Sequence, residues 1–192
     1  MEPVTAAVHT TEVLMVADMA AISAAGIINN CPARFMSSDD SSDHPNIIAF
    51  PPFIFLGCAL VSSALRFLFP LRLMDYSISW PIGVALALLA ISLAIWAVSV
   101  MRAGGTNVRP DRPALAIVRR GPYRFTRNPM YLALCILHVS LGFLLNSWMP
   151  IIFTPVLALL LHFGVILREE RYLESKFGED YLALKRTVRR WI

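Results

Sequence analysis

Long runs without a charged residue divide most of the chain after residue 50 into segments of membrane-spanning length. No charged side chain occurs between residues 76 and 101, and forty uncharged residues follow from 128 to 167. A helix needs about 20 apolar residues to cross the bilayer core, so the second run is too long for one crossing. Asn146, Ser147 and Pro150 interrupt it near its middle, which predicts a tight helical hairpin.

This pattern predicts an all-α integral membrane protein with four membrane-spanning helices and a C-terminal helical hairpin. We place the spans at about residues 52–70, 80–101, 129–146 and 150–167. Residues 11–28 are also apolar but contain Glu12 and Asp18, and residues 37–43 have the polar sequence SSDDSSD. We therefore interpret residues 1–50 as a short helix and a partly mobile linker, and a fifth span over residues 11–28 stays open.

Composition strengthens the membrane prediction. Of the 192 residues, 57% are apolar and 16% are charged, against about 45–50% and about 25% in a soluble domain. Disorder, collagen-like repeats and coiled coils are excluded. Cys31, Cys58 and Cys135 are scattered, so we expect no disulfide framework and no metal site. The first basic residue is Arg34, and we expect no cleaved signal peptide.

The net charge of +4 is a sum over unlike parts of the chain. The first 65 residues contain one arginine against six acidic residues, whereas the loop between Met101 and Asn128 contains seven arginines against one aspartate. The positive-inside rule therefore predicts that this loop and the C-terminus are cytoplasmic and that Asn146 lies on the other side. Arg66 and Arg72 then fall on the outer side, against the rule. The arginines predict topology and the wall of a site rather than a nucleic-acid surface.

The cytoplasmic loop has the composition of a folded segment. Residues 104–131 have the sequence GGTNVRPDRPALAIVRRGPYRFTRNPMY, with four prolines and three glycines. A loop that only touches anionic lipid headgroups would account for the arginines. It would need neither the aromatic residues Tyr123, Phe125 and Tyr131 nor the apolar stretch at 115–118. We therefore favour a ligand-binding role for this segment.

The region after the last span supplies a second half for such a site. Apolar residues recur there at helical spacing, at Leu173, Phe177, Tyr181, Leu184 and Val188. Gly178 is expected to break this helix locally. Glu169 and Glu170 lie at the membrane boundary opposite the basic loop. A solvated helix face is one interpretation of them, and a site shared with the loop is the one we favour.

Two motifs carry a family resemblance. The sequence GPYRFTRNPMY, followed about forty residues later by EERYLESKFGEDYLALKRTV, resembles the membrane methyltransferase superfamily of isoprenylcysteine carboxyl methyltransferases and phospholipid N-methyltransferases. The shared pattern is G-x-Y, R-H-P-x-Y, E-E, F-G-x-x-Y and a final basic stretch, over roughly residues 104–190. The resemblance implies that residues 51–192 form a membrane methyltransferase domain. It also implies that S-adenosyl-L-methionine binds between the loop and the start of the C-terminal helix, without a Rossmann fold.

Carried over position by position, the resemblance implies the site residues. The cofactor pocket would be lined by Leu115, Ile117, Val118, Tyr123, Asn128, Pro129, Met130, Tyr131 and Glu169. Of these, Glu169 would accept hydrogen bonds from the cofactor. Two further residues would have catalytic roles. Arg127 would anchor a carboxylate of the cofactor or substrate, and Glu170 would act as a base or orient the nucleophile.

Three positions depart from the family pattern. R-H-P is R-N-P here, and Asn128 can donate and accept hydrogen bonds but does not titrate near neutrality. Leu115 replaces a histidine. Val165 replaces the arginine that holds the substrate carboxylate in the prenylcysteine enzymes, which puts carboxyl methylation in doubt.

We therefore predict S-adenosyl-L-methionine-dependent methyl transfer to a membrane-borne or lipophilic acceptor, without a metal. The acceptor would be a prenylcysteine-like carboxylate, a lipid amine or a small thiol, and the partners membrane lipid and this substrate, with no nucleic acid. His138 and His162 lie inside the predicted spans, as core residues or along a substrate path. The alternatives are a membrane reductase similar to the sterol reductases and a non-catalytic lipid- or partner-binding protein. The expected location is a bacterial inner membrane.

Overall fold

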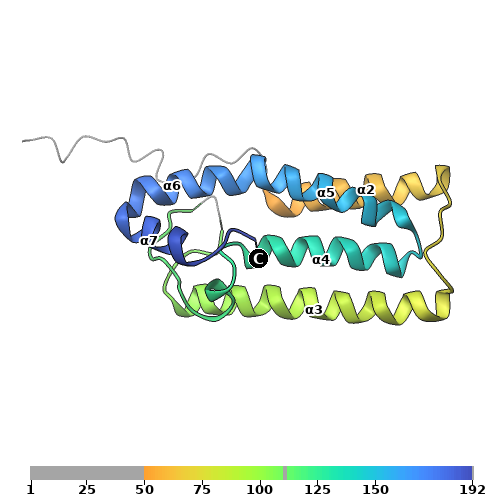
Figure 1. Ribbon diagram of the computed structural model, residues 1–192, viewed down its shortest axis with the longest axis horizontal. Helices are drawn as coiled ribbons and strands as arrows, with labels where there is room; N and C mark the ends of the chain where they lie inside the picture. The colour runs from red at the N-terminus through yellow and green to blue at the C-terminus, as the bar shows by residue number, and fades with distance from the viewer. Residues whose placement is uncertain (1–49, 110–111, 192) are drawn as a thin grey trace, which may run out of the picture. The chain divides into compact units, whose positions relative to one another are not determined.

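The computed structural model describes residues 50–109 and 112–191. The predictions for residues 1–49, including the span over 11–28, lie outside this part of the chain. The helices in order are α2 (Pro51–Leu68), α3 (Tyr76–Ala103), η2 (Gly121–Arg124), α4 (Pro129–Leu144), α5 (Trp148–Leu161), η3 (His162–Ile166), α6 (Leu167–Phe177) and α7 (Glu179–Thr187) (Figure 1). Of the two short ones, η2 is a 3-10 helix and η3 a π-helix.

Apolar helices cover the four predicted spans, and the all-helical prediction is confirmed for the described residues. Three helices are long and apolar enough to cross a membrane: α2, α3 and the continuous helix Trp148–Phe177, which combines α5, η3 and α6. The fourth, α4, has 16 residues and is therefore about 24 Å long. The structure thus supports a membrane protein whose α4 is shorter than the bilayer core is thick.

Local sequence explains where the helices begin and end. Proline lies in the first turn of α2 and of α4, where its missing N–H group costs no hydrogen bond. The turn of the predicted hairpin contains Asn146 at a φ of 48°, and the Ser147 side chain caps α5 by accepting from the Met149 N–H group. Gly178, at a φ of 51°, separates α6 from α7, as the sequence predicts.

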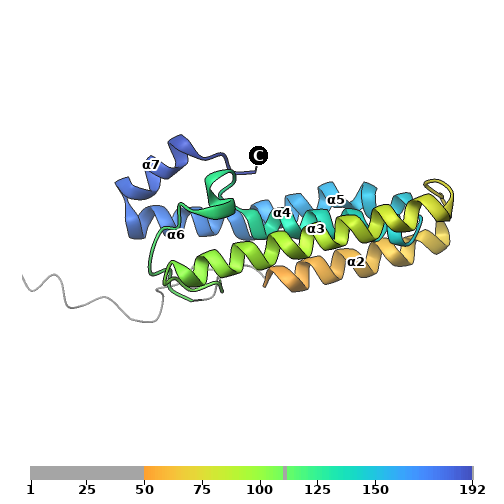
Figure 2. The same ribbon diagram turned by 90° about the horizontal axis from the view of Figure 1, so that it is seen from below.

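Helix α4 is the centre of the bundle, and it packs against α3, α5 and α2 (Figures 1 and 2). The face of α3 that is buried consists of small residues only, namely Ser79, Gly83, Ala90 and Ala97. Small residues let two helix backbones approach closely, which is how helices associate in a bilayer that offers no hydrophobic driving force. The position of α4, from which the pocket wall begins, therefore depends on this close approach.

Gly83 provides a test of the α3–α4 contact. A Cβ atom at this position would lie 2.8 Å from the backbone nitrogen of Leu144 and 2.8 Å from its Cγ atom, so a helix backbone must move. We expect Gly83→Ala to destabilise the protein by about 1–3 kcal/mol through overpacking. The measurement is thermal unfolding in detergent. Gly57→Ala in α2 is the matched control, because nothing lies within 4 Å of its added Cβ atom; equal unfolding temperatures for the two variants would contradict the close packing.

Polar side chains inside the bundle find partners there. His138 in α4 is fully buried, and its ring nitrogens lie 3.3 Å from Ser62 Oγ and 3.0 Å from Thr154 Oγ1. These contacts join α4 to α2 and α5. His138 is therefore a core residue that links three helices. The predicted substrate path would have to pass elsewhere.

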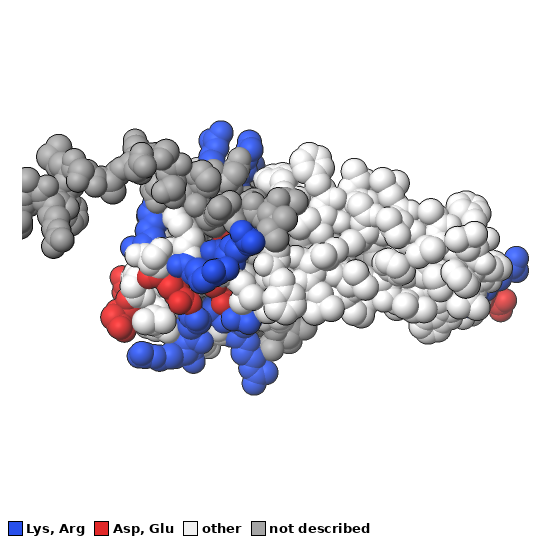
Figure 3. Space-filling model, turned by 90° about the horizontal axis from the view of Figure 1, so that it is seen from above, with Lys and Arg blue, Asp and Glu red and all other residues white. Residues whose placement is uncertain are grey.

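The charged side chains gather at one end of the helices, around α6 and α7, and a broad apolar surface separates them from a few charges at the opposite end (Figure 3). At that opposite end, Asn146 joins the loop between α4 and α5, in which it lies, to the loop between α2 and α3. Its Oδ1 atom accepts from the N–H groups of Leu73 and Met74, and its Nδ2 atom donates to the Met74 carbonyl oxygen. Most of the charged side chains of the described residues therefore lie at the α6–α7 end.

Candidate functional site

A pocket opens at the charged end, between the segment that follows α3 and the helices α6 and α7. Its volume, with the open mouth included, is about 900 Å³. It is lined by Met101, Thr106, Asn107, Val108, Arg109, Arg112, Ala114, Ala116, Ile117, Val118, Tyr123, Arg127, Asn128, Pro129, Met130, Tyr131, Glu169, Glu170, Tyr172, Leu173, Tyr181 and Leu184.

The structure brings together on this wall every predicted site residue except one. The exception is Leu115, which is 62% exposed. Its neighbours Ala114 and Ala116 line the pocket instead. The Leu115 N–H group donates to Thr106 Oγ1 over 3.0 Å, so this position shapes the loop through its backbone while its side chain points elsewhere.

Several lining residues were not predicted. Thr106 and Asn107 hold the loop in shape, and Asn107 donates to the Pro113 carbonyl oxygen over 2.8 Å. The Tyr172 hydroxyl accepts from the Ala114 N–H group over 3.2 Å and so ties α6 to the loop. Tyr181 and Leu184 belong to the apolar stripe of the C-terminal helix, and this pattern was the available signal for them. For Met101, at the end of α3, the sequence offered none.

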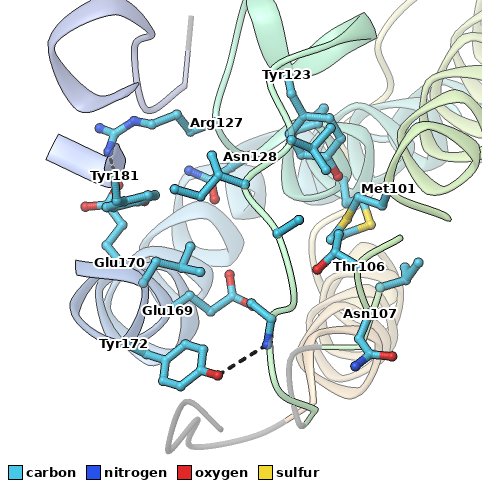
Figure 4. A pocket seen from close by; sticks show the side chains of 18 of the residues that line it. Met101, Thr106, Asn107, Tyr123, Arg127, Asn128, Glu169, Glu170, Tyr172 and Tyr181 are labelled. Atoms are coloured by element: carbon cyan, nitrogen blue, oxygen red, sulfur yellow. Dashed lines mark hydrogen bonds and ion pairs between the residues drawn. The ribbon is translucent and has the colours of Figure 1, made fainter. Parts of the chain in front are cut away.

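Glu169 and two tyrosines form the polar centre of the pocket. The Tyr131 hydroxyl donates to Glu169 Oε1 over 2.7 Å. The hydroxyl of Tyr123 is buried and has no hydrogen-bond partner among the described residues. Glu169 and Tyr123 point into the pocket from different sides (Figure 4). A ligand that carries both donors and acceptors would therefore meet an acceptor at Glu169 and a hydroxyl with unused hydrogen-bonding capacity at Tyr123.

Glu169 lies in α6, beyond the uncharged span that ends at Leu167. Burial raises the pKa of its carboxyl from 4.5 to about 7, the hydrogen bond from Tyr131 opposes this increase in pKa, and the Glu170 charge adds to it. Burial and the charge of Glu169 also raise the pKa of the Tyr123 hydroxyl, so this phenol is neutral and able to donate. The protonation state of Glu169 therefore changes within the physiological pH range.

Glu170 is in a different environment from Glu169. It is buried, and its Oε1 atom lies 3.0 Å from a guanidinium nitrogen of Arg127. Arg190 donates to both of its oxygens, from Nε over 2.9 Å and from a terminal nitrogen over 2.7 Å. A carboxylate between two guanidinium groups is occupied as an acceptor. The geometry thus favours orientation over the predicted role of Glu170 as a base.

Arg127 points toward Glu170 and Tyr181 rather than across the pocket (Figure 4). Its side chain is 8% exposed in the ion pair with Glu170. Burial and the Glu170 charge raise the pKa of the Tyr181 hydroxyl to about 12, while Arg127 lowers it. The predicted contact of Arg127 with a ligand carboxylate would have to share the guanidinium with Glu170.

Helix α7 is fastened over the pocket from several sides. A guanidinium nitrogen of Arg119 donates to the Asp180 carbonyl oxygen over 2.6 Å. Lys185 forms an ion pair with Glu174 of α6. The first of these contacts joins α7 to the segment before η2, and the second joins it to α6.

The arrangement is suited to an organic ligand with polar and apolar parts. The described residues contain no group of three metal-ligating side chains that could hold an ion. Alanine, valine, isoleucine, leucine and methionine side chains supply apolar walls, and the carboxylate and phenol groups supply directional contacts. Such a site can bind a nucleoside-sized molecule, orient it and keep water from it.

Known proteins similar to this chain are consistent with this geometry. Residues 78–180 match the sequence model of the family described as phospholipid methyltransferase. This match runs from the first turn of α3 to the first turn of α7 and contains most of the pocket wall. The chain is also 36% identical over 63 residues to a protein of Haemophilus influenzae named only as uncharacterized. The matched part is 33% of this chain and the whole of that protein.

Proposed function

Because the chain belongs to the phospholipid methyltransferase family, we propose that it transfers a methyl group from S-adenosyl-L-methionine to a lipid amine presented by the bilayer. Family membership implies a membrane methyltransferase; the cofactor and the acceptor are our proposal. The observation that carries it is the pocket at the charged end of the apolar helices, where Glu169, Tyr131 and Tyr123 meet an apolar wall.

The residues present suit this cofactor. Glu169 can accept hydrogen bonds from ribose hydroxyls or from the amino group of the methionyl part. The unpartnered hydroxyl of Tyr123 can donate to a further polar atom of the ligand. The alanine, isoleucine and valine side chains of residues 114–118 that line the pocket offer an apolar surface to the adenine ring. When bound, S-adenosyl-L-methionine supplies a methyl group activated by a sulfonium centre.

The chain's own contribution to the reaction is alignment and exclusion of water. Pro129 at the start of α4 and Leu184 of α7 both line the wall. The ion pair between Glu170 and Arg127 fixes the position of α6 relative to the segment before α4, and both of these form part of the pocket wall. Holding two reactants in line can lower the barrier of such a displacement by about 7–11 kcal/mol.

The environment of Val165 bears on the acceptor. At this position the prenylcysteine enzymes, as the resemblance implies, have an arginine that holds the substrate carboxylate. Val165 is fully buried and packs in the core cluster with Leu161 and Ile166. Nothing at this position offers a charge to a substrate carboxylate. We therefore propose an amine rather than a prenylcysteine carboxylate as the acceptor.

We further propose that the pocket faces the cytoplasm. The loop between α3 and α4 has a surplus of arginine, and such loops remain on the cytoplasmic side of a membrane. An inner bacterial membrane would place the pocket next to the cellular supply of the cofactor. A cysteine introduced at the exposed Ala103, the last residue of α3, in a variant without the three native cysteines, would then be modified by membrane-impermeant reagents only from the cytoplasmic side.

The decisive experiment uses the purified full chain. Binding of S-adenosyl-L-methionine is measured in detergent, and transfer of labelled methyl groups is measured into vesicles of phosphatidylethanolamine. Vesicles of phosphatidylcholine alone, a prenylcysteine analogue and a small thiol are the comparison acceptors. Label in phosphatidylethanolamine alone supports the proposal. Label in the prenylcysteine analogue or the thiol refutes the lipid amine, and the absence of saturable binding refutes the cofactor.

The pKa of Glu169 predicts how cofactor affinity depends on pH. Since this pKa is about 7 in the protein, protonation below pH 7 removes the carboxylate that accepts from the ligand. We expect the dissociation constant to rise about tenfold between pH 8 and pH 6. Titrations at several pH values measure it. Glu169→Gln should bind weakly at every pH without this step, and an equal pH dependence in both proteins would contradict the assignment.

A further inference from the structure

We propose that Arg190 is a positioning residue of the pocket, which acts by holding Glu170 with its guanidinium group and the segment before α4 with its carbonyl oxygen. The proposal rests on the proposed function for its activity readout. Arg190 lies outside the residues that match the family. It follows α7, in the C-terminal segment of residues 188–191, and does not line the pocket itself.

The backbone of the C-terminal segment runs beside the stretch that precedes α4. Thr126 and Arg189 form a parallel bridge, and the Arg127 N–H group donates to the Arg189 carbonyl oxygen over 3.0 Å. The Arg190 carbonyl oxygen accepts from Thr126 Oγ1 over 3.1 Å and from Asn128 Nδ2 over 3.0 Å. In Figure 1 this segment accordingly ends beside the start of α4. Three consecutive residues, Thr126, Arg127 and Asn128, are thus hydrogen-bonded to this short C-terminal segment.

The side chains of the segment reach two further parts of the protein. The Arg190 guanidinium makes a two-point contact with Glu170 in α6. Trp191 packs against the core cluster that contains Tyr131 and Leu161. The segment therefore connects α6, the bundle core and the start of α4, and these are the parts that carry Glu169, Tyr131 and Asn128.

The charges explain why this connection matters for the pocket. Glu170 is buried and adjacent to Glu169, so its charge must be compensated in place. Arg127 supplies one compensating charge from the pocket wall, and Arg190 supplies the second from outside. With both in place, Glu170 is fixed between them and Arg127 is drawn against α6. Without Arg190, Glu170 loses one of the two partners that define its orientation, and Arg127 then pairs with a less fixed carboxylate.

Arg190→Gln tests the guanidinium contact alone, because the backbone hydrogen bonds of residue 190 remain. We expect the dissociation constant for S-adenosyl-L-methionine to rise about tenfold, since small displacements of a wall have effects of this size or larger. Arg190→Lys keeps the charge and should recover part of the affinity. The matched control is Arg189→Gln, which removes the same charge from the neighbouring residue, whose exposed side chain lies outside the pocket. The thermal unfolding temperature without ligand should fall for Arg190→Gln but not for this control, because Glu170 loses one of its two compensating charges, so affinities are compared at a temperature where both variants are folded.

Wild-type affinity in Arg190→Gln would overturn the proposal, as would an equal loss in the Arg189→Gln control. A double variant provides a second measurement, because Arg190→Gln should change affinity little once Glu170 is already glutamine. Independent, multiplicative losses in the double variant would also overturn it. If the wild-type protein does not bind S-adenosyl-L-methionine, the proposed function fails instead. This result differs from the outcomes of the single and double variants, which require a wild-type protein that binds.

Discussion

Glu169→Gln is expected to weaken the binding of S-adenosyl-L-methionine about a hundredfold and to reduce methyl transfer with it. A hydrogen bond to an ionised group contributes about 1.5–3 kcal/mol, and about 2.7 kcal/mol corresponds to two orders of magnitude in affinity. Inside the pocket, a carboxylate oxygen of Glu169 accepts a hydrogen bond from the Tyr131 hydroxyl. The glutamine side chain has the same shape and can still accept from Tyr131, so the fold should be retained.

The measurement is a binding titration on the purified protein, together with thermal unfolding without ligand. Glu179→Gln is the matched control, because Glu179 is exposed in the first turn of α7 and does not line the pocket. It should bind as the wild type does. An unchanged affinity in Glu169→Gln would show that the ligand does not use this carboxylate and would remove the main support for the proposed cofactor.

Glu170→Gln is expected to lower stability by about 3 kcal/mol and to weaken cofactor binding through the same cause. The substitution leaves the buried guanidinium of Arg127 without its carboxylate, and removing one partner of a buried ion pair costs about 3–5 kcal/mol. Arg190 is partly exposed and can be hydrated, so the lower end of that range applies. The unfolding temperature should fall by about 10 °C.

The two roles of Glu170 make different predictions for this variant. If Glu170 orients the site, unfolding temperature and affinity fall together. If it acts as a base, turnover alone is lost, and this result would contradict the structural role. Glu174→Gln in the same helix is the control. Its ion pair with Lys185 is partly exposed on both sides, and such pairs contribute less than about 1 kcal/mol.

The sequence predicted the helices better than it predicted the roles of the charges. Uncharged runs and interrupting polar residues place helices within a few residues, because a bilayer imposes length and polarity on each segment. The exception is the last span, which continues through η3 into α6 as one helix. A charged stretch can remain helical after it has left the membrane, so hydropathy marks the end of the span and not the end of the helix.

Glu169 and Glu170 illustrate the limit most clearly. They are adjacent in sequence and equivalent in pattern, yet one faces the pocket and the other is held between Arg127 and Arg190. Successive residues of a helix point about 100° apart, so their environments are set by different neighbours. Arg190 lies twenty residues along the chain, and no spacing rule connects it to Glu170.

The sequence by itself therefore determined that this is a helical membrane protein, with basic and acidic side chains concentrated outside its long apolar helices and a methyltransferase motif among them. Hydropathy and periodicity are local properties that each segment carries in its own sequence. Only the tertiary structure decided which charges meet, that Leu115 turns away while Ala114 and Ala116 line the pocket, and that residues 188–191 hold the start of α4. These depend on contacts between distant segments, whose geometry arises only when the helices pack.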